Sequence, residues 1–322
     1  MARPSAVNKT LDEMLGKGLL MRGDDESLVI QRIPFGLPDL DEVVGGGIPR
    51  KRITILTGEY SAGKSFLVQL LIKSAMDKGL QAAYLDTERS YDPIWWHTVG
   101  LDTNKLLISQ PATGEDATDV AVALAEAGLD VIAIDSLAGM VPREMAEESA
   151  DKKFIASQPR LMNRFFQKIL ACKNNAAIVC TNQLRSHLGP GPMDTMPGGW
   201  GQLFYTHLML RMFRESWIEE QGKRVGFNMK IICRKSKVGT PFREVILPFR
   251  FRGEIDSLSL LLDRALEAGL IRQTSAWYQL PGSDEKVMGR NTVLSLLVGD
   301  AALCRNLEIA LGREKRGLIE AS

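Results

Sequence analysis

Short apolar runs and helical repeats alternate along the middle of the chain. Continuous apolar residues occupy 52–57, 82–86, 130–135 and 176–181. The segments at 64–78, 115–128 and 159–173 are typical of helices. Continuous apolar strands separated by helices indicate a mostly parallel sheet that helices cover on both faces. The pattern therefore predicts an α/β fold.

The pattern changes toward both ends of the chain. Apolar residues at helical spacing predict a short amphipathic helix over residues 8–22. After the core, three apolar segments follow with short polar breaks, at 207–213, 227–233 and 243–249. We expect these to be strands joined by hairpins at one edge of the sheet. A helix over 257–269 then begins a small mixed α+β domain that extends to about Leu311.

Two stretches are expected to lack regular structure, one at 142–153 and one at 185–200. The first is rich in charge, and the second contains several Gly-Pro and Gly-Gly pairs. Loops of this length in a compact domain are usually functional or disordered. Both follow the carboxyl ends of predicted core strands, which is the edge where open α/β sheets bind ligands.

A complete phosphate-binding pattern lies between the strand at 52–57 and the helix that follows it. Its members are Gly58, Glu59, Tyr60, Ser61, Ala62, Gly63, Lys64 and Ser65. A glycine-rich turn there directs backbone N–H groups and the positive helix end at one point, which suits a triphosphate. Lys64 can reach the β- and γ-phosphates, and the Ser65 hydroxyl can hold Mg²⁺. The alternative is a glycine turn without a ligand, and the flanking strand and helix argue against it.

Three polar residues follow core strands at the same edge. Asp135 ends the strand at 130–135, where a carboxylate can hold the Mg²⁺ shell. Glu88 follows the strand at 82–86 and can orient or deprotonate an attacking water, although a solvated loop acid is the alternative. The amide of Gln183 can contact the γ-phosphate just before the long Gly/Pro loop. Together with the phosphate loop, these residues predict ATP and Mg²⁺ as ligands.

The charge balance restricts the kind of partner. The 322 residues hold 40 Lys and Arg against 39 Asp and Glu, so a nucleic acid would have to bind a local basic surface. The four cysteines are scattered without CxxC spacing, which indicates neither a zinc site nor a disulfide framework. No signal sequence and no apolar stretch of about 18 residues occur. We therefore expect a soluble, cytoplasmic protein without a membrane partner.

Several longer motifs carry a resemblance to a known family. They are YLDTERSYDPIWWHTVGLD, LLISQPATGEDA, DVIAIDSLAGMVPRE, TNQLR, KSKVGTPF and AWYQLPG. In this order, from about residue 8 to 311, the chain resembles the bacterial RecA recombinases. The stretch GEIDSLSLLLDRALEAGL is more similar to bacteriophage UvsX-type recombinases. The resemblance implies an N-terminal oligomerisation arm over 1–34, a RecA-type ATPase core over 35–253, and a C-terminal DNA-capture domain with its tail over 254–322.

The resemblance also implies roles for residues around the nucleotide. Glu88 is expected to be the catalytic glutamate, Asp135 to hold Mg²⁺ through water, and Gln183 to sense the γ-phosphate. Trp95 is expected to stack on adenine, with Asp92 and Phe66 nearby. Lys235 and Lys237 match a lysine pair that reaches the ATP of the neighbouring subunit, and Phe204 matches an aromatic residue at the subunit interface. From the residues alone, a solvated basic face is the favoured interpretation of the lysines, and Phe204 would be a core residue.

The loops at 142–153 and 185–199 match the family's two DNA-facing loops. Residues expected to contact DNA are Arg160, Asn163, Arg164, Arg185, Met193, Met196, Gly198 and Gly199, with Lys286 and Arg290 in the small domain. Arginines there can bind phosphate, methionines can insert between base steps, and glycines let backbone N–H groups approach phosphate. Ordinary surface arginines and loop methionines are the alternatives.

These expectations combine into an ATP-dependent DNA strand-exchange recombinase. It would form a helical filament on single-stranded DNA and pair that strand with homologous double-stranded DNA, in association with nucleoid or phage DNA. One alternative is a hexameric RecA-type helicase, which has no reason to carry the small domain and the KSK pair. A second is a non-hydrolysing recombination mediator, against which Glu88 argues. A third is an ATPase that serves protein partners.

Overall fold

A nine-stranded sheet forms the centre of the molecule, in the order β11-β10-β9-β8-β3-β7-β6-β4-β5. The computed structural model describes residues 23–147, 157–184, 196–199 and 201–312. Six strands are parallel: β3 (Arg52–Gly58), β4 (Ala82–Asp86), β5 (Leu107–Ser109), β6 (Val131–Asp135), β7 (Ala177–Gln183) and β8 (Leu208–Glu220). Three antiparallel strands continue the sheet: β9 (Lys223–Ser236), β10 (Glu244–Arg250) and β11 (Glu254–Ile255). The predicted α/β core with a hairpin edge is confirmed.

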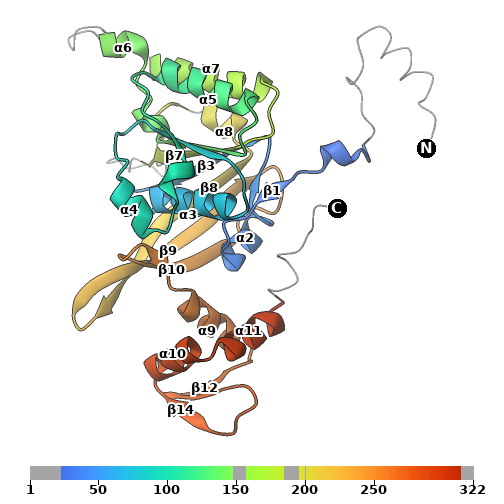
Figure 1. The fold of residues 1–322 in the computed structure, drawn as a ribbon, viewed down its shortest axis with the longest axis vertical. Helices are drawn as coiled ribbons and strands as arrows, with labels where there is room; N and C mark the ends of the chain where they lie inside the picture. The colour runs from blue at the N-terminus through green and yellow to red at the C-terminus, as the bar shows by residue number, and fades with distance from the viewer. Residues whose placement is uncertain (1–22, 148–156, 185–195, 200, 313–322) are drawn as a thin grey trace, which may run out of the picture.

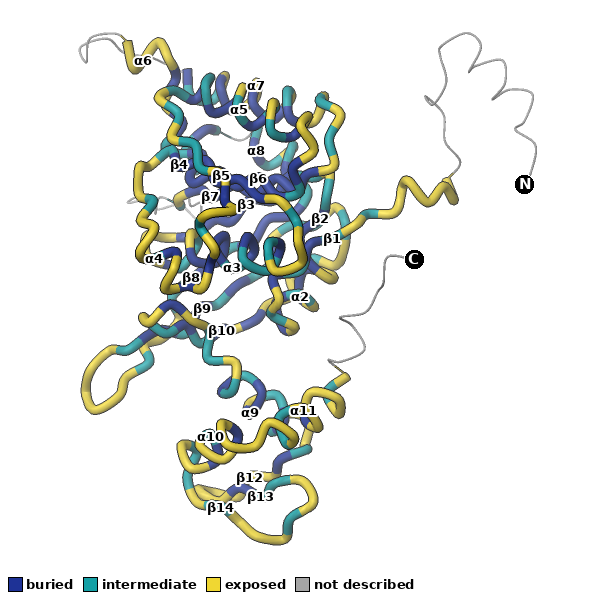
Figure 2. Tube along the Cα trace, in the orientation of Figure 1, coloured by how far each residue is buried: buried dark blue, intermediate teal, exposed yellow. Residues whose placement is uncertain are grey.

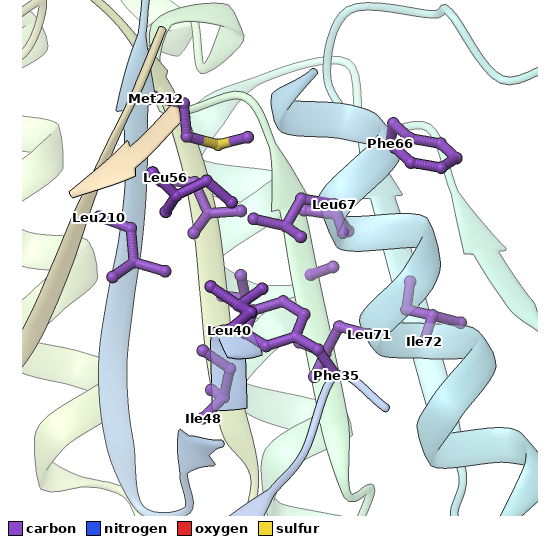
Figure 3. Close-up of a cluster of buried hydrophobic side chains, with 14 of the residues drawn as sticks. Phe35, Leu40, Ile48, Leu56, Phe66, Leu67, Leu71, Ile72, Leu210 and Met212 are labelled. Atoms are coloured by element: carbon purple, nitrogen blue, oxygen red, sulfur yellow. The ribbon is translucent and has the colours of Figure 1, made fainter. Parts of the chain in front are cut away.

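Helices cover both faces of the sheet (Figure 1). One face carries α2 (Pro38–Val43) and α3 (Lys64–Asp77), and the other carries α5 (Gly114–Glu126) and α7 (Ser157–Ala171). The strands alternate between the two cores: Leu56 packs with the α3 side, as Figure 3 shows, whereas Ile55 packs with α5 and α7. This arrangement explains why the strands are apolar at successive positions.

Shorter elements connect these layers. They are η1 (Glu26–Leu28), β1 (Arg32–Ile33), β2 (Ile48–Pro49), α4 (Pro93–Thr98), η2 (Thr103–Lys105), η3 (Leu137–Gly139), α6 (Arg143–Glu147) and α8 (Gly201–Tyr205). The presence of α6 corrects the expectation that the whole stretch from residue 142 lacks regular structure. The backbone amide of Arg143, the first residue of α6, donates a hydrogen bond to the carboxylate of Glu115. The charged residues here therefore begin a short helix. The helix expected over 8–22 lies outside the described residues.

The β8–β9 hairpin is longer than the apolar pattern predicted. Residues 214–226 pair across the two strands beyond the sheet core and form a projecting ribbon, gold in Figure 1. Gln221 and Gly222 form its turn with φ of 51° and 75°, which matches the twist of a two-residue hairpin. Most residues of this ribbon are exposed, and many are charged. The ribbon therefore carries no apolar run from which a strand could be predicted.

A second, smaller unit follows the sheet. It consists of α9 (Ser257–Glu267), β12 (Arg272–Thr274), β13 (Trp277–Gln279), β14 (Lys286–Met288), α10 (Arg290–Gly299) and α11 (Ala301–Ala310). Its own core includes Leu262, Val293 and Leu297, and Figure 2 shows that this unit is mostly exposed. An ion pair between Arg264 and Asp39, with Nε and Oδ1 3.0 Å apart, ties α9 to α2. Within the described residues, no helix is long and apolar enough to cross a membrane.

The packing of α3 generates a matched test of core stability. Leu71 on α3 is fully buried, whereas Leu170 on α7 is 42% exposed. Leu71→Ala should lower the free energy of unfolding by about 2–5 kcal/mol, because it leaves a cavity under the sheet. Leu170→Ala should change it by about 0.5 kcal/mol or less. Urea denaturation of both variants measures this, and equal losses would contradict the assignment of this face to the core.

Candidate functional site

The predicted phosphate loop connects the end of β3 to the first turn of α3. Gly63 precedes Lys64 with φ +87°, and a Cβ there would lie 2.5 Å from Cε of Met229. A Cβ at Gly58 would lie 2.5 Å from the carbonyl oxygen of Met212. Glycine is therefore required at Gly63 by its left-handed backbone conformation and at Gly58 by the close approach of another strand's backbone. The N-terminus of a 14-residue helix directs unpaired N–H groups into the loop, which creates an anion site.

Lys64 lies inside this loop. Its Nζ donates to the carbonyl oxygens of Gly58, at 3.1 Å, and Glu59, at 2.6 Å. Burial lowers the pKa of Lys64, and the negative charges of Asp135, Glu88 and Glu59 oppose that shift. The ammonium group is thus held by two neutral carbonyls and faces the carboxylates across the loop.

Asp135 occupies the carboxyl end of β6 and is only 4% exposed. Its Oδ2 accepts a hydrogen bond of 2.9 Å from the Tyr84 hydroxyl, and its Oδ1 accepts one from Thr181. Burial, followed by the charge of Asp135, raises the pKa of Tyr84 well above its ordinary value. Next to it, the Ser136 hydroxyl donates to Oε1 of Glu88. The structure therefore brings Asp135 and Glu88 to the same sheet edge as the phosphate loop.

Asp86, for which no role was predicted, orders the segment after β4 that carries Glu88. It is fully buried and is paired in register with Asp135. Its carboxylate accepts hydrogen bonds from the N–H groups of Ser90 and Tyr91, both 3.0 Å, and from Nε2 of Gln110, at 2.9 Å. Burial opposes ionisation, but these donors together lower the pKa of Asp86. Its place at the end of an apolar strand was the signal available in the sequence.

An aromatic cavity of about 400 Å³ adjoins the phosphate loop. It is lined by 61–66 together with Trp95, Phe227, Phe249 and Phe251. Trp95 lies where an adenine ring could stack, and its Nε1 donates to Oε1 of Gln69 at 3.2 Å. Asp92 does not line the cavity; it caps α4 by accepting from the amide of Ile94.

Three of the lining aromatics were missed from the sequence. Phe249 packs on Phe66 with ring centroids 4.4 Å apart and on Phe227 at 5.1 Å. Phe251 contacts Phe227 and Phe249 and is 45% exposed. These phenylalanines are visible in the sequence, but no local pattern indicates that this edge of the sheet lies beside the phosphate loop. The cavity is suited to a flat, apolar ring.

Gln183 ends β7 beside the phosphate loop, because it pairs in register with Gly58. The preceding residue, Asn182, is fully buried and donates from Nδ2 to Oε1 of Gln202 at 2.7 Å and to the carbonyl of Pro197 at 3.1 Å. Gln202 in turn donates to the carbonyls of Pro197 and Gly199. A buried amide pair therefore joins the end of β7 to the turn at 196–199 and to α8.

Lys235, Lys237 and Phe204 come together at α8. The Lys237 Nζ donates to the carbonyl oxygen of Phe204 at 2.6 Å, and the Lys235 Nζ donates to that of Leu203. Both ammonium groups thus satisfy carbonyls that the end of a helix leaves unpaired. The Phe204 side chain points to solvent and is 74% exposed, which excludes the alternative that it is a core residue.

The lysine pair and the phosphate loop lie at opposite ends of the same strands. Gly58 pairs with Met212 of β8, whereas Lys235 pairs with Met209, which lies beside Ile55 of β3. Three strand residues, about 10 Å, separate these levels, and the phosphate loop continues away from the lysines. The carbonyl that Lys235 binds belongs to Leu203 of α8 and not to the phosphate loop. One chain therefore does not bring its lysine pair to its own phosphate loop.

The residues expected to contact DNA are only partly described. Arg160, Asn163 and Arg164 lie on the exposed side of α7, and Arg164 lines a cavity of about 170 Å³ with Arg143 and Lys168. Gly198 and Gly199 form the turn held by Gln202, and Met196 beside it is half-buried. Arg185 and Met193 lie outside the described residues. Lys286 is exposed on β14, whereas Arg290 is paired with Asp263 through two contacts of 2.6 and 3.0 Å.

His207 lies between α8 and β8, and no role was predicted for it. Its surroundings allow a test of how stability depends on pH. Its Nδ1 accepts from the amide of Ile53 at 3.3 Å. Burial, together with the charges of Arg52, Lys237 and Lys235, lowers its pKa from 6.5 to about 4. Between these values the unfolded chain binds a proton that the folded chain does not, so stability should fall as the pH falls through this window.

His207→Asn should flatten that part of the stability curve. The measurement is the free energy of unfolding in urea at several pH values between 4 and 7, compared between the two proteins. Asp41, whose pKa burial raises to about 6, has the opposite effect in an overlapping range. It is common to both proteins and cancels in the difference. Parallel curves would contradict a depressed pKa at His207.

Known proteins are similar in sequence to this chain over most of its length. The model of the RecA N-terminal domain matches residues 4–256. Protein RecA of Frankia casuarinae is 34% identical over 316 residues, which are 96% of this chain and 91% of the relative. Protein RecA of Thermus aquaticus is 36% identical over 278 residues, 84% of this chain and 82% of the relative. Protein RecA of Chlorobaculum tepidum is 34% identical over 303 residues, 92% and 87% respectively. The chain therefore belongs to the RecA family.

Proposed function

We propose that this chain is a DNA-dependent ATPase that polymerises on single-stranded DNA and exchanges that strand with a homologous duplex. Membership of the RecA family supports a role in recombination and repair. The observation that carries the proposal is the separation of Lys235 and Lys237 from the phosphate loop of their own chain. A nucleotide bound by both must lie between two copies.

Each side of such a junction supplies a different part of the site. The loop at 58–65, with Phe66, binds the triphosphate, and Trp95 and the phenylalanine wall bind the base. Ser65 and Asp135 would hold Mg²⁺, which would neutralise charge on the phosphates. Glu88, oriented by Ser136, activates the attacking water. The next copy adds the two ammonium groups of Lys235 and Lys237, which stabilise charge on the transferred phosphoryl group.

This junction is head-to-tail and uses different surfaces on its two sides. Such a contact generates an open helix unless its rotation happens to close a ring. Phe204 supports the same junction, because it projects into solvent one residue away from the Lys235 acceptor, Leu203. An exposed aromatic residue of this size is suited to a pocket on a neighbouring copy.

The buried amide pair couples the nucleotide to DNA. Gln183 would contact the γ-phosphate at the end of β7, and Asn182 beside it is bonded to Gln202 and to the turn containing Gly198 and Gly199. A shift at the end of β7 would therefore move the segment predicted to face DNA. After hydrolysis Gln183 loses the γ-phosphate as its partner, and the affinity for DNA falls.

The DNA contacts would come from two surfaces. Arg160, Asn163 and Arg164 on α7, with Arg185, Met193 and Met196 in the loop, would hold the backbone of the single strand and separate its bases. Base pairing then supplies the sequence specificity. In the small unit, Lys286 is the more accessible cation for a duplex, since Arg290 is paired with Asp263.

Replacement of the catalytic carboxylate tests the hydrolytic part of the proposal. Glu88→Gln keeps the shape and the Ser136 contact, and it should lower ATP turnover on single-stranded DNA by about 10²-fold or more. Glu126→Gln, on the exposed side of α5, is the matched control and should turn over like the unchanged protein. The same preparations are assayed for strand exchange between homologous DNA molecules. Full turnover by Glu88→Gln would refute its role, and unstimulated turnover in the unchanged protein would favour an ATPase that serves other partners.

Mixing two impaired variants tests the shared site. Lys64→Ala removes the phosphate contact of one copy, and Lys237→Ala removes the contact to the neighbour. Alone, each should turn over ATP at about a tenth of the rate of the unchanged protein or less. In an equal mixture about a quarter of the junctions combine an intact loop with an intact lysine, so turnover should partly return. A mixture as inactive as its components would contradict a site built from two copies.

A further inference from the structure

Arg32 connects three segments that are far apart in the sequence. It lies on β1, at the end of the segment over 1–34 that is predicted to form the oligomerisation arm. Its Nη1 donates to the carbonyl oxygens of Val44 and Gly47, each at 3.0 Å, and its Nη2 donates to that of Val238. Val238 directly follows Lys237, so one guanidinium holds the segment that carries the lysine pair.

The environment of Arg32 consists of carbonyl groups rather than acids. Among the residues that the structure describes, no carboxylate forms an ion pair with it. The guanidinium lies against the Gly45–Gly47 turn, where a Cβ on Gly45 would be 3.7 Å from Cζ of Arg32. The planar fork of arginine can bond several carbonyls in fixed directions, which the single ammonium group of lysine cannot do.

The lysine segment has few other anchors at this point. The amide of Lys237 donates to the carbonyl of His207 at 2.8 Å, and the amide of Val238 donates to Oγ of Ser236. The strand pairing of β8 with β9 ends at Ser236. Beyond Ser236, the hydrogen bond from Arg32 to the carbonyl of Val238 therefore joins the backbone after Lys237 to β1, which is the base of the arm.

We infer that Arg32 is a positioning residue for Lys235 and Lys237, and that it couples the base of the N-terminal arm to the lysine side of the nucleotide junction. The inference rests on the proposed function, in which these lysines reach the neighbour's ATP. In the isolated chain the ammonium groups are bonded to the carbonyls of Leu203 and Phe204. A neighbour's phosphates compete with those carbonyls, and the Arg32 bond keeps the backbone in place while the side chains exchange partners.

The test compares the kinetics of three single variants and one double variant of the full chain. Arg32→Ala should raise the ATP concentration for half-maximal turnover on single-stranded DNA by about tenfold, and Arg32→Lys by less, because lysine replaces only part of the fork. Lys237→Ala should be impaired at least as strongly. Arg32→Ala combined with Lys237→Ala should be no worse than Lys237→Ala alone, since the arginine acts through the lysine.

Arg243→Ala is the matched control. Arg243 also braces α2, through the carbonyl and the carboxylate of Glu42 at 2.8 Å each, but it does not contact the lysine segment. It should leave the ATP requirement unchanged, and ATP binding without DNA should be the same in every variant. If Arg32→Ala folds poorly, Arg32→Lys carries the same comparison.

The outcomes separate the inference from the proposal on which it rests. Turnover by Lys237→Ala equal to that of the unchanged protein would overturn the shared nucleotide site, and the inference with it. A defective Lys237→Ala beside an Arg32→Ala that behaves like Arg243→Ala would overturn the inference alone. Additive losses in the double variant would also overturn it, because they would mean that Arg32 acts independently of the lysine.

Discussion

The distance between two sets of positive charge along one pair of strands governs the rest of this structure. Lys64 and the N-terminus of α3 lie at the carboxyl end of β3, whereas Lys235 and Lys237 lie at the opposite end of its neighbours. In the proposed function, the remaining positive charge on the triphosphate comes from another copy. Assembly and nucleotide chemistry would then depend on each other.

The same separation explains the state of the lysines in a single chain. Without a neighbour, an exposed ammonium pair would be solvated and mobile; here it is bonded to the last carbonyls of α8. Those carbonyls belong to the helix that displays Phe204 and that contacts Asn182 through Gln202. The lysines, the exposed aromatic residue and the link to the predicted DNA loop therefore share one small helix. A change in any one of these contacts would therefore affect the others.

Local chemistry made part of this site predictable. The phosphate loop follows from glycines that allow a tight turn and from a strand and helix on either side, and Asp135 follows from its place at a strand end. Contacts between distant segments were not predictable in this way. The phenylalanine wall depends on how β9 and β10 are placed beside the loop, and the three bonds of Arg32 depend on how β1 meets residues 44–47 and 238. Similarly, the charged ribbon at 214–226 is held by cross-strand pairing without an apolar run.

A structure of the protein on single-stranded DNA with a non-hydrolysable ATP analogue tests the central claim most directly. Nζ of Lys235 and of Lys237 should lie within hydrogen-bond distance of the phosphates held by the loop of the adjacent copy, and neither should remain on the carbonyls of Leu203 and Phe204. Phosphates contacted by one copy alone, with both lysines still bonded to α8, would contradict the account.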